Sequence, residues 1–133
     1  MIPLKKFIPG IAWFFLVLIL LCLPGYDLPK ADDWMSAIYF DKWVHTGLFS
    51  VMTFLFIMPL KNVDIPLAKK KSTALKICIA LSIWGLTTEF IQKYFIAGRS
   101  FDLWDWGADS VGVLFALIIC SRLYLRISNY KNQ

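Results

Sequence analysis

Charged residues are scarce in this 133-residue chain: Asp, Glu, Lys and Arg make up 17% of it, whereas ordinary soluble domains carry about 25%. Apolar residues reach 59%, and the mean hydropathy is +0.63. So little polar surface cannot cover a water-facing globule, which argues against a soluble domain. The length also excludes a large single-chain transporter, and it leaves no room for a separate soluble catalytic domain beside membrane spans.

Cysteine is also sparse, and the sequence lacks a C-x-x-C pair or a zinc-like spacing. Cys22, Cys78 and Cys120 all lie in apolar runs, and an odd number of such cysteines is no disulfide framework. We interpret them as small apolar residues. A small-x-small cleavage site is missing after the first apolar run, which favours an uncleaved first span over a signal peptide.

Four apolar runs can each be assigned to a membrane span of about 20 residues. They cover residues 7–23, 43–60, 77–97 and 103–125. The last two runs contain acidic residues, but these lie near one end, where the cost of a charge in lipid falls. The sequence therefore predicts an all-α fold, a polytopic four-helix membrane bundle formed as a single domain by residues 1–133.

Lysine and arginine are unevenly distributed around these spans. With both termini inside, ten lie on the inner side and four on the outer side. This positive-inside bias predicts an N-in, C-in topology. Because membrane topology accounts for the net charge of +5, we expect no nucleic-acid partner.

The outer ends of the spans collect eight of the nine acidic residues. In the first outer loop, residues 26–40, Asp32 and Asp33 precede apolar residues at helical spacing, which predicts a short interfacial helix lying on the membrane. Aromatic residues near these ends predict an interfacial belt. The belt would consist of Trp34, Tyr39, Trp43, Tyr94, Trp104 and Trp106.

Ionisable and polar residues from three spans and one loop share this depth. Within each span they are three or four residues apart, so they lie on one helical face. Intramembrane ionisable residues normally face the bundle interior and mark functional sites. The group contains Asp41, Lys42 and His45 at the second span, Glu89 and Gln92 in the third, Arg99 in the next loop, and Asp102, Asp105 and Asp109 at the fourth.

Each of these residues has a functional and a structural interpretation. His45 is a candidate general base or metal ligand, since imidazole titrates near neutral pH; alternatively it is a helix-end imidazole bonded to Asp41 or to a neighbouring span. Asp41 also fits a helix cap. Glu89 suits proton transfer in a partly dehydrated pocket, or an ion pair with Arg99 or Lys42 that fixes packing.

Arg99 has a planar fork that binds phosphate or carboxylate, and the obvious anion at an outer leaflet is a lipid phosphate. Its alternative is a bridge to Asp102 or Asp105. Asp102 also fits a cap of the fourth helix, and Gln92 a hydrogen bond between helices. Gly107 and Gly112 favour close helix packing.

The residues are assigned to two groups of roles. The candidate catalytic residues are His45, Glu89 and Asp105, and the candidate ligand-binding residues are Asp41, Lys42, Gln92, Arg99, Asp102 and Asp109. The sequence names no cofactor, although oxygen and nitrogen ligands of this kind would suit Mg²⁺, Mn²⁺ or Zn²⁺.

An ordered set of motifs resembles the VanZ-like family over roughly residues 41–118. The motifs are Asp41-Lys42-x-x-His45, Glu89-x-x-Gln92, and Gly98-Arg99 followed by Asp105 and Gly112. The family pattern usually has Asn where this chain has Asp109, which adds a charge. The resemblance implies a small multi-pass protein of the bacterial cytoplasmic (inner) membrane, and the namesake's association with teicoplanin resistance implies a link to the cell envelope. It supplies no reaction.

Several classes of function remain open. We favour binding of an anionic envelope lipid, a lipid-linked cell-envelope precursor or a glycopeptide at the outer face. An acid–base or metal-dependent enzyme acting on a lipid-linked substrate is the alternative, although H-E-x-x-H and G-x-S-x-G are missing. A structural or accessory membrane subunit is a third possibility. Ion translocation is disfavoured because the inner halves of the spans are almost uniformly apolar.

Overall fold

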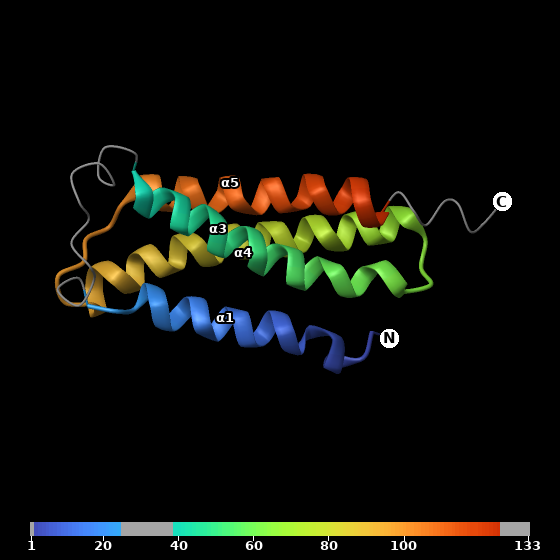
Figure 1. Cartoon of the computed structure of the whole chain (residues 1–133), viewed down its shortest axis with the longest axis horizontal. Helices are drawn as coiled ribbons and strands as arrows, with labels where there is room; N and C mark the ends of the chain where they lie inside the picture. Colours follow the sequence, from blue (N-terminus) through green and yellow to red (C-terminus); the bar gives the residue numbers. More distant parts are fainter. Residues whose placement is uncertain (1, 25–38, 126–133) are drawn as a thin grey trace.

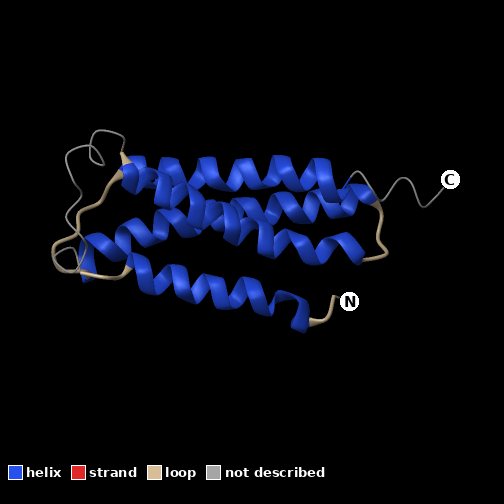
Figure 2. Cartoon of the chain, in the orientation of Figure 1, coloured by secondary structure: helices blue, strands red, loops and turns tan. Residues whose placement is uncertain are grey.

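The computed structural model describes residues 2–24 and 39–125, and this part of the chain is helical with short connections (Figure 2). Its main helices lie side by side in an elongated bundle (Figure 1). They are α1 (Ile8–Leu21), α3 (Phe40–Ile57), α4 (Leu67–Phe95) and α5 (Leu103–Cys120). Together with their flanking turns, all four are long and apolar enough to cross a membrane. The prediction of an all-α fold with four candidate spans is confirmed.

The two ends of the bundle differ in which helix termini they hold. α1 and α4 end, and α3 and α5 begin, at one end, which we call the polar end (Figure 1). The start of α1, the connection from α3 to α4 and the last turn of α5 lie at the opposite end (Figure 1). The four helices alternate in direction, so the first begins and the last ends at the same end of the bundle. The expected interfacial helix in residues 26–40 lies almost wholly outside the described residues.

Helix boundaries differ from the expected spans most at α4, which begins at Leu67 rather than near residue 77. Lysines at positions 69–71 belong to this helix, because lysine is a good helix former although hydropathy places it outside a span. Lys70 is buried, and its Nζ donates to the carbonyl oxygen of Lys61 at 3.2 Å. That bond ties the start of α4 to the short 3₁₀ helix η3 (Met58–Asn62) that follows α3.

The core lies between the helices and is mainly apolar. Val17 of α1, Phe49 and Met52 of α3, and Val113 of α5 are at most 2% exposed. Large apolar side chains also face outward, and Ile83 of α4 is 61% exposed. An apolar exterior around an apolar core is the pattern that a lipid environment requires.

α3 and α5 approach each other closely at Gly112. A Cβ at Gly112 would overlap the backbone oxygen of Thr46 and lie 3.1 Å from the Ser50 nitrogen. Thr46 Oγ1 donates to the Ala108 carbonyl at 3.1 Å, and Ser50 Oγ to the Gly112 carbonyl at 3.0 Å. The close packing expected of Gly112 is confirmed. The same expectation for Gly107 is wrong for the described part of the chain, where a Cβ at this position would meet no neighbouring atom within 4 Å.

Candidate functional site

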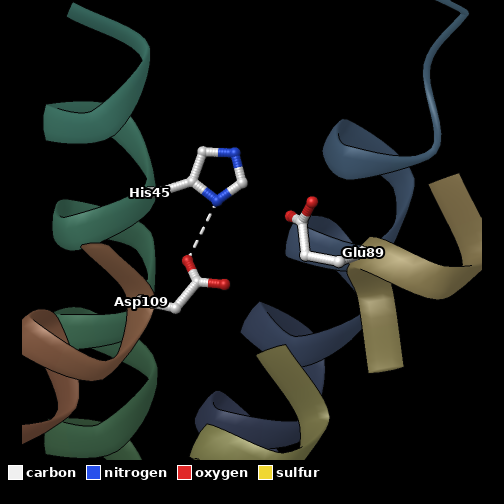
Figure 3. A group of neighbouring side chains, drawn as sticks. All are labelled: His45, Glu89 and Asp109. Carbon is white, nitrogen blue, oxygen red and sulfur yellow. Dashed lines mark hydrogen bonds and ion pairs between the residues drawn. The ribbon is translucent and has the colours of Figure 1, made fainter. Parts of the chain in front are cut away.

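Three polar side chains from three helices converge inside the bundle near the polar end. They are His45 of α3, Glu89 of α4 and Asp109 of α5, and Figure 3 shows them pointing toward one another. His45 is 5% exposed, and the other two are fully buried. His45 Nδ1 and Asp109 Oδ1 lie 2.9 Å apart, a hydrogen-bond distance. We call these three residues the buried triad.

Room for the buried triad comes from a glycine that the sequence analysis missed. A Cβ at Gly85 would lie 2.8 Å from Asp109 Oδ2 and 3.1 Å from Asp109 Cβ, so only glycine leaves space for this carboxylate. Gly85 precedes Glu89 by four residues and therefore shares its helical face. That spacing was the signal in the sequence that could have identified it.

Two carboxylate oxygens of the buried triad have no hydrogen-bond partner among the described residues. They are Glu89 Oε1 and Asp109 Oδ2. The second oxygen of Glu89, Oε2, accepts the backbone N–H of Asp102 at 2.9 Å. Because an unpaired buried polar atom costs free energy, such atoms are rare and call for an explanation. The buried triad therefore has unused capacity to bind a donor or a cation.

A second cluster lies beside the buried triad and is centred on Lys42. The Nζ atom lies 2.9 Å from Asp41 Oδ2, 2.5 Å from Asp102 Oδ2 and 2.6 Å from Asp105 Oδ1. We call these four residues the Lys42 cluster. It joins the first turn of α3 to the start of α5. Three carboxylates around one ammonium leave the cluster with an excess of negative charge.

Asp102 also caps the N-terminus of α5. Its Oδ1 accepts the backbone N–H of Trp104 at 2.8 Å, so it is the N-cap of the helix. The hydrogen bond from Lys42 holds the pKa of Asp102 below its usual range, and the Trp104 bond acts in the same direction. The interpretation of Asp102 as a helix cap is confirmed, and its contact with Lys42 adds a role in the cluster.

Asp105 connects the two clusters. One of its oxygens binds Lys42, and the other, Oδ2, lies 3.9 Å from His45 Nε2. Asp105 and Asp109 both face the bundle interior, as their spacing on α5 predicted. The polar network thus extends inward from Asp41, whose side chain is 61% exposed, to the fully buried Asp109.

Gln92, three residues after Glu89 on α4, makes its hydrogen bond outside this network. Its Nε2 donates to the backbone carbonyl of Leu21, at the end of α1, at 2.9 Å. The structural alternative considered for Gln92, a hydrogen bond that joins two helices, is therefore the one that the geometry favours.

Arg99 lies in the turn between α4 and α5. The turn closes with a bond from the Arg99 N–H to the Ile96 carbonyl at 3.3 Å. Gly98 in this turn has a φ of 74°, a conformation that glycine adopts without strain. The Nε of Arg99 is buried and has no hydrogen-bond partner within the described part of the chain. No ion pair joins it there to Asp102 or Asp105, the alternative that its position suggested.

The structure thus connects seven of the nine candidate residues in one network and places two apart from it. The connected residues are Asp41, Lys42, His45, Glu89, Asp102, Asp105 and Asp109. Gln92 and Arg99 lie apart from the network. Residue spacing predicted the grouping, because it places polar residues of each helix on one face at one depth.

Among the described residues, two groups of acidic side chains, one of them with an imidazole, are close enough to hold a metal ion. In the group formed by Asp41, Asp102 and Asp105, the ammonium of Lys42 already supplies the cation. The buried triad contains no such ammonium. The two carboxylates of the buried triad therefore have no protein ammonium beside them among the described residues.

Comparisons of this chain with protein-family models, with curated proteins and with solved structures find no significant match. The VanZ-like resemblance therefore rests on the sequence motifs alone and stays a prediction.

Proposed function

We propose that this chain is a multi-pass protein of the bacterial cytoplasmic membrane, related to the VanZ-like family, with both termini in the cytoplasm. Its polar end then faces the extracytoplasmic side and binds the headgroup of an anionic envelope lipid or a related amphiphile. The observation that carries the proposal is the position of the polar network at one end of a bundle whose core is mainly apolar. In a membrane, that end lies at the depth of the lipid headgroups.

Exposed aromatic side chains at the same end support this placement. Tyr39, Trp43, Tyr94 and Trp104 are between 67% and 80% exposed, and they flank the helix termini of the polar end. Tyrosine and tryptophan are enriched where a membrane meets water, because their rings are apolar and their tips are polar. Trp34 of the expected belt lies outside the described residues.

Arg99 is a better binding residue for the anion than Lys42. Three carboxylates surround Lys42, so an approaching phosphate would meet excess negative charge there. Arg99 offers a guanidinium in the connecting turn, and its Nε has no partner among the residues described. A guanidinium can bind a phosphate through two parallel hydrogen bonds. The headgroup phosphate is therefore assigned to Arg99.

Lipid analysis of the purified protein tests this assignment. The protein is purified in a mild detergent, and its co-purified lipids are compared with those of the source membrane. One anionic class should be enriched with the wild type and at least tenfold less with Arg99→Ala. Lys93→Ala is the matched control, because Lys93 is an exposed cation in the last turn of α4. Equal enrichment in all three proteins would contradict the proposal.

A membrane-embedded acid–base or metal-dependent enzyme is the second candidate function. The His45–Asp109 pair favours it, because a carboxylate that fixes an imidazole is the usual way to orient a general base. Asp105, 3.9 Å from the other ring nitrogen, would be a third catalytic group. If the chain turns over a lipid-linked substrate, His45→Ala should retain a bound lipid of different mass from the lipid bound to the wild type. Identical lipids in both would count against catalysis.

A role in glycopeptide resistance follows from the VanZ-like resemblance. Expression of the chain in a susceptible bacterium should then raise the inhibitory concentration of teicoplanin, and Arg99→Ala should not. A structural or accessory subunit, the remaining alternative, predicts instead that variants of the polar network fail to fold and show no separable loss of lipid or resistance.

A further inference from the structure

We propose that the buried triad is a binding site for one divalent metal ion of the Zn²⁺ or Mn²⁺ class. This inference rests on the proposed function in one respect: the role of the ion would be to help bind the anionic headgroup at the polar end. Ion binding itself can be measured without any lipid.

The ligand set fits such an ion in number, distance and type. One ligand atom from each of His45, Glu89 and Asp109 lies within 4.8 Å of the others. Bonds of about 2.1 Å in a tetrahedral site place ligand atoms roughly 3.4 Å apart, so small side-chain rotations would complete the geometry. An imidazole nitrogen with carboxylate oxygens suits Zn²⁺ or Mn²⁺, whereas Ca²⁺ and Mg²⁺ prefer oxygen alone.

The unpartnered oxygens of the triad are the independent observation that points to a ligand. Glu89 Oε1 and Asp109 Oδ2 belong to side chains with no exposed surface, and neither has a partner among the described residues. Figure 3 shows both carboxylates turned toward the imidazole of His45. Buried polar atoms without a protein partner commonly mark a site for a missing ion or water.

Charge balance supports the same conclusion. Two carboxylates and a neutral imidazole carry two negative charges, which one divalent cation neutralises, and a buried site needs that neutrality. The neighbouring Lys42 cluster has an ammonium among its carboxylates, which offsets part of their negative charge. The bundle therefore holds two anionic clusters, of which only the Lys42 cluster has a protein cation among the described residues.

A metal ion would also explain how an anionic headgroup could bind beside so many acids. With three protein ligands, Zn²⁺ or Mn²⁺ keeps at least one coordination position for an oxygen atom from water or a phosphate. The ion and Arg99 would then place two positive groups at the polar end.

Metal analysis of the full-length protein tests the inference. The detergent-purified chain is stripped with a chelator, equilibrated with Zn²⁺ or with Mn²⁺ alone, and freed of unbound ion before metal is quantified. The wild type should retain about one ion per chain at saturation, since the described residues form one triad of this kind. Asp109→Asn and Glu89→Gln should bind at least tenfold more weakly. Asp64→Asn, which alters an exposed carboxylate between α3 and α4 at the opposite end of the bundle, is the matched control and should bind like the wild type.

Cobalt spectroscopy of the wild type identifies the type of ligand without any variant, so it tests the inference even if a variant fails to fold. Co²⁺ in the triad should give ligand-field bands without the thiolate charge-transfer band that binding to Cys22, Cys78 or Cys120 would produce. A thiolate band, no binding, or equal binding by folded Asp109→Asn and wild type would overturn the inference. Bound metal without selective lipid would refute only the proposed function, and selective lipid without metal only the inference.

Discussion

At the scale of single residues, the space for the buried triad depends on the absence of a side chain at Gly85. Gly85 has no Cβ, and a Cβ there would lie 2.8 Å from Asp109 Oδ2. Gly85→Ala should therefore destabilise the protein by about 1–3 kcal/mol, the usual cost of overpacking a close-packed interior. The free energy of unfolding in mixed detergent micelles measures this change.

Gly107→Ala is the control for that prediction. It lies in α5, and an added Cβ would meet none of the described neighbouring atoms within 4 Å. Alanine favours a helix over glycine by about 1 kcal/mol, so this variant should be as stable as the wild type or more stable. Equal effects of the two substitutions would show that Gly85 does not limit the space around Asp109.

The Lys42–Asp102 contact predicts a dependence of stability on pH. Asp102 has a lowered pKa because Lys42 hydrogen-bonds to its carboxylate. An acid with a lower pKa in the folded state stabilises that state above its unfolded pKa of about 3.9, and the stabilisation is lost as the pH falls through the folded pKa. The free energy of unfolding, measured between neutral pH and about pH 3, should decrease less in Asp102→Asn than in the wild type as the pH is lowered. The same acid-induced loss in both proteins would contradict this account of Asp102.

Much of the site could be predicted from spacing, and its pairings could not. Residues three or four apart place Asp105 and Asp109 on one face of α5, which is a local property of a helix. That Asp105 contacts Lys42 while Asp109 contacts His45 depends on the register between α3 and α5. This register is set by tertiary packing at Gly112, which spacing within one helix does not report.

At the scale of helices, the close approach of α3 and α5 depends on Gly112. A Cβ there would overlap the backbone oxygen of Thr46, and backbone atoms cannot rotate away as a side chain can. Gly112→Ala should therefore separate the two helices, cost about 3 kcal/mol or more, and weaken any ligand binding by the triad. Thermal unfolding in detergent measures the loss of stability.

Gly47→Ala provides the comparison on α3, since an added Cβ would meet no atom of the other described residues within 4 Å. A Gly112→Ala protein as stable as Gly47→Ala would contradict the described helix contact.

The existence of these helices could be predicted from hydropathy alone, because the length and apolar composition of each helix can be read from its own stretch of sequence. The start of α4 did not, since Lys70 is buried by a contact with the backbone of Lys61 that hydropathy cannot represent.

At the scale of the whole molecule, the bundle order and the positive-inside bias together predict which loops are accessible from each side. In a variant without native cysteines, Ala97→Cys, between α4 and α5, should react with a membrane-impermeant maleimide added to intact cells. Asp64→Cys, between α3 and α4, should react only after lysis. Both positions are exposed and lie at opposite ends of the bundle. The reverse pattern would place the polar end in the cytoplasm and contradict the proposed topology.

The central claim is that the polar end binds an anionic lipid through Arg99. Native mass spectrometry of the detergent-purified protein tests it most directly, because bound lipid and bound metal appear as separate mass increments on the intact chain. The wild type and Lys93→Ala should carry an anionic lipid that folded Arg99→Ala loses, and a metal increment should disappear in folded His45→Ala. A lipid increment unchanged between the wild type and Arg99→Ala would contradict the account.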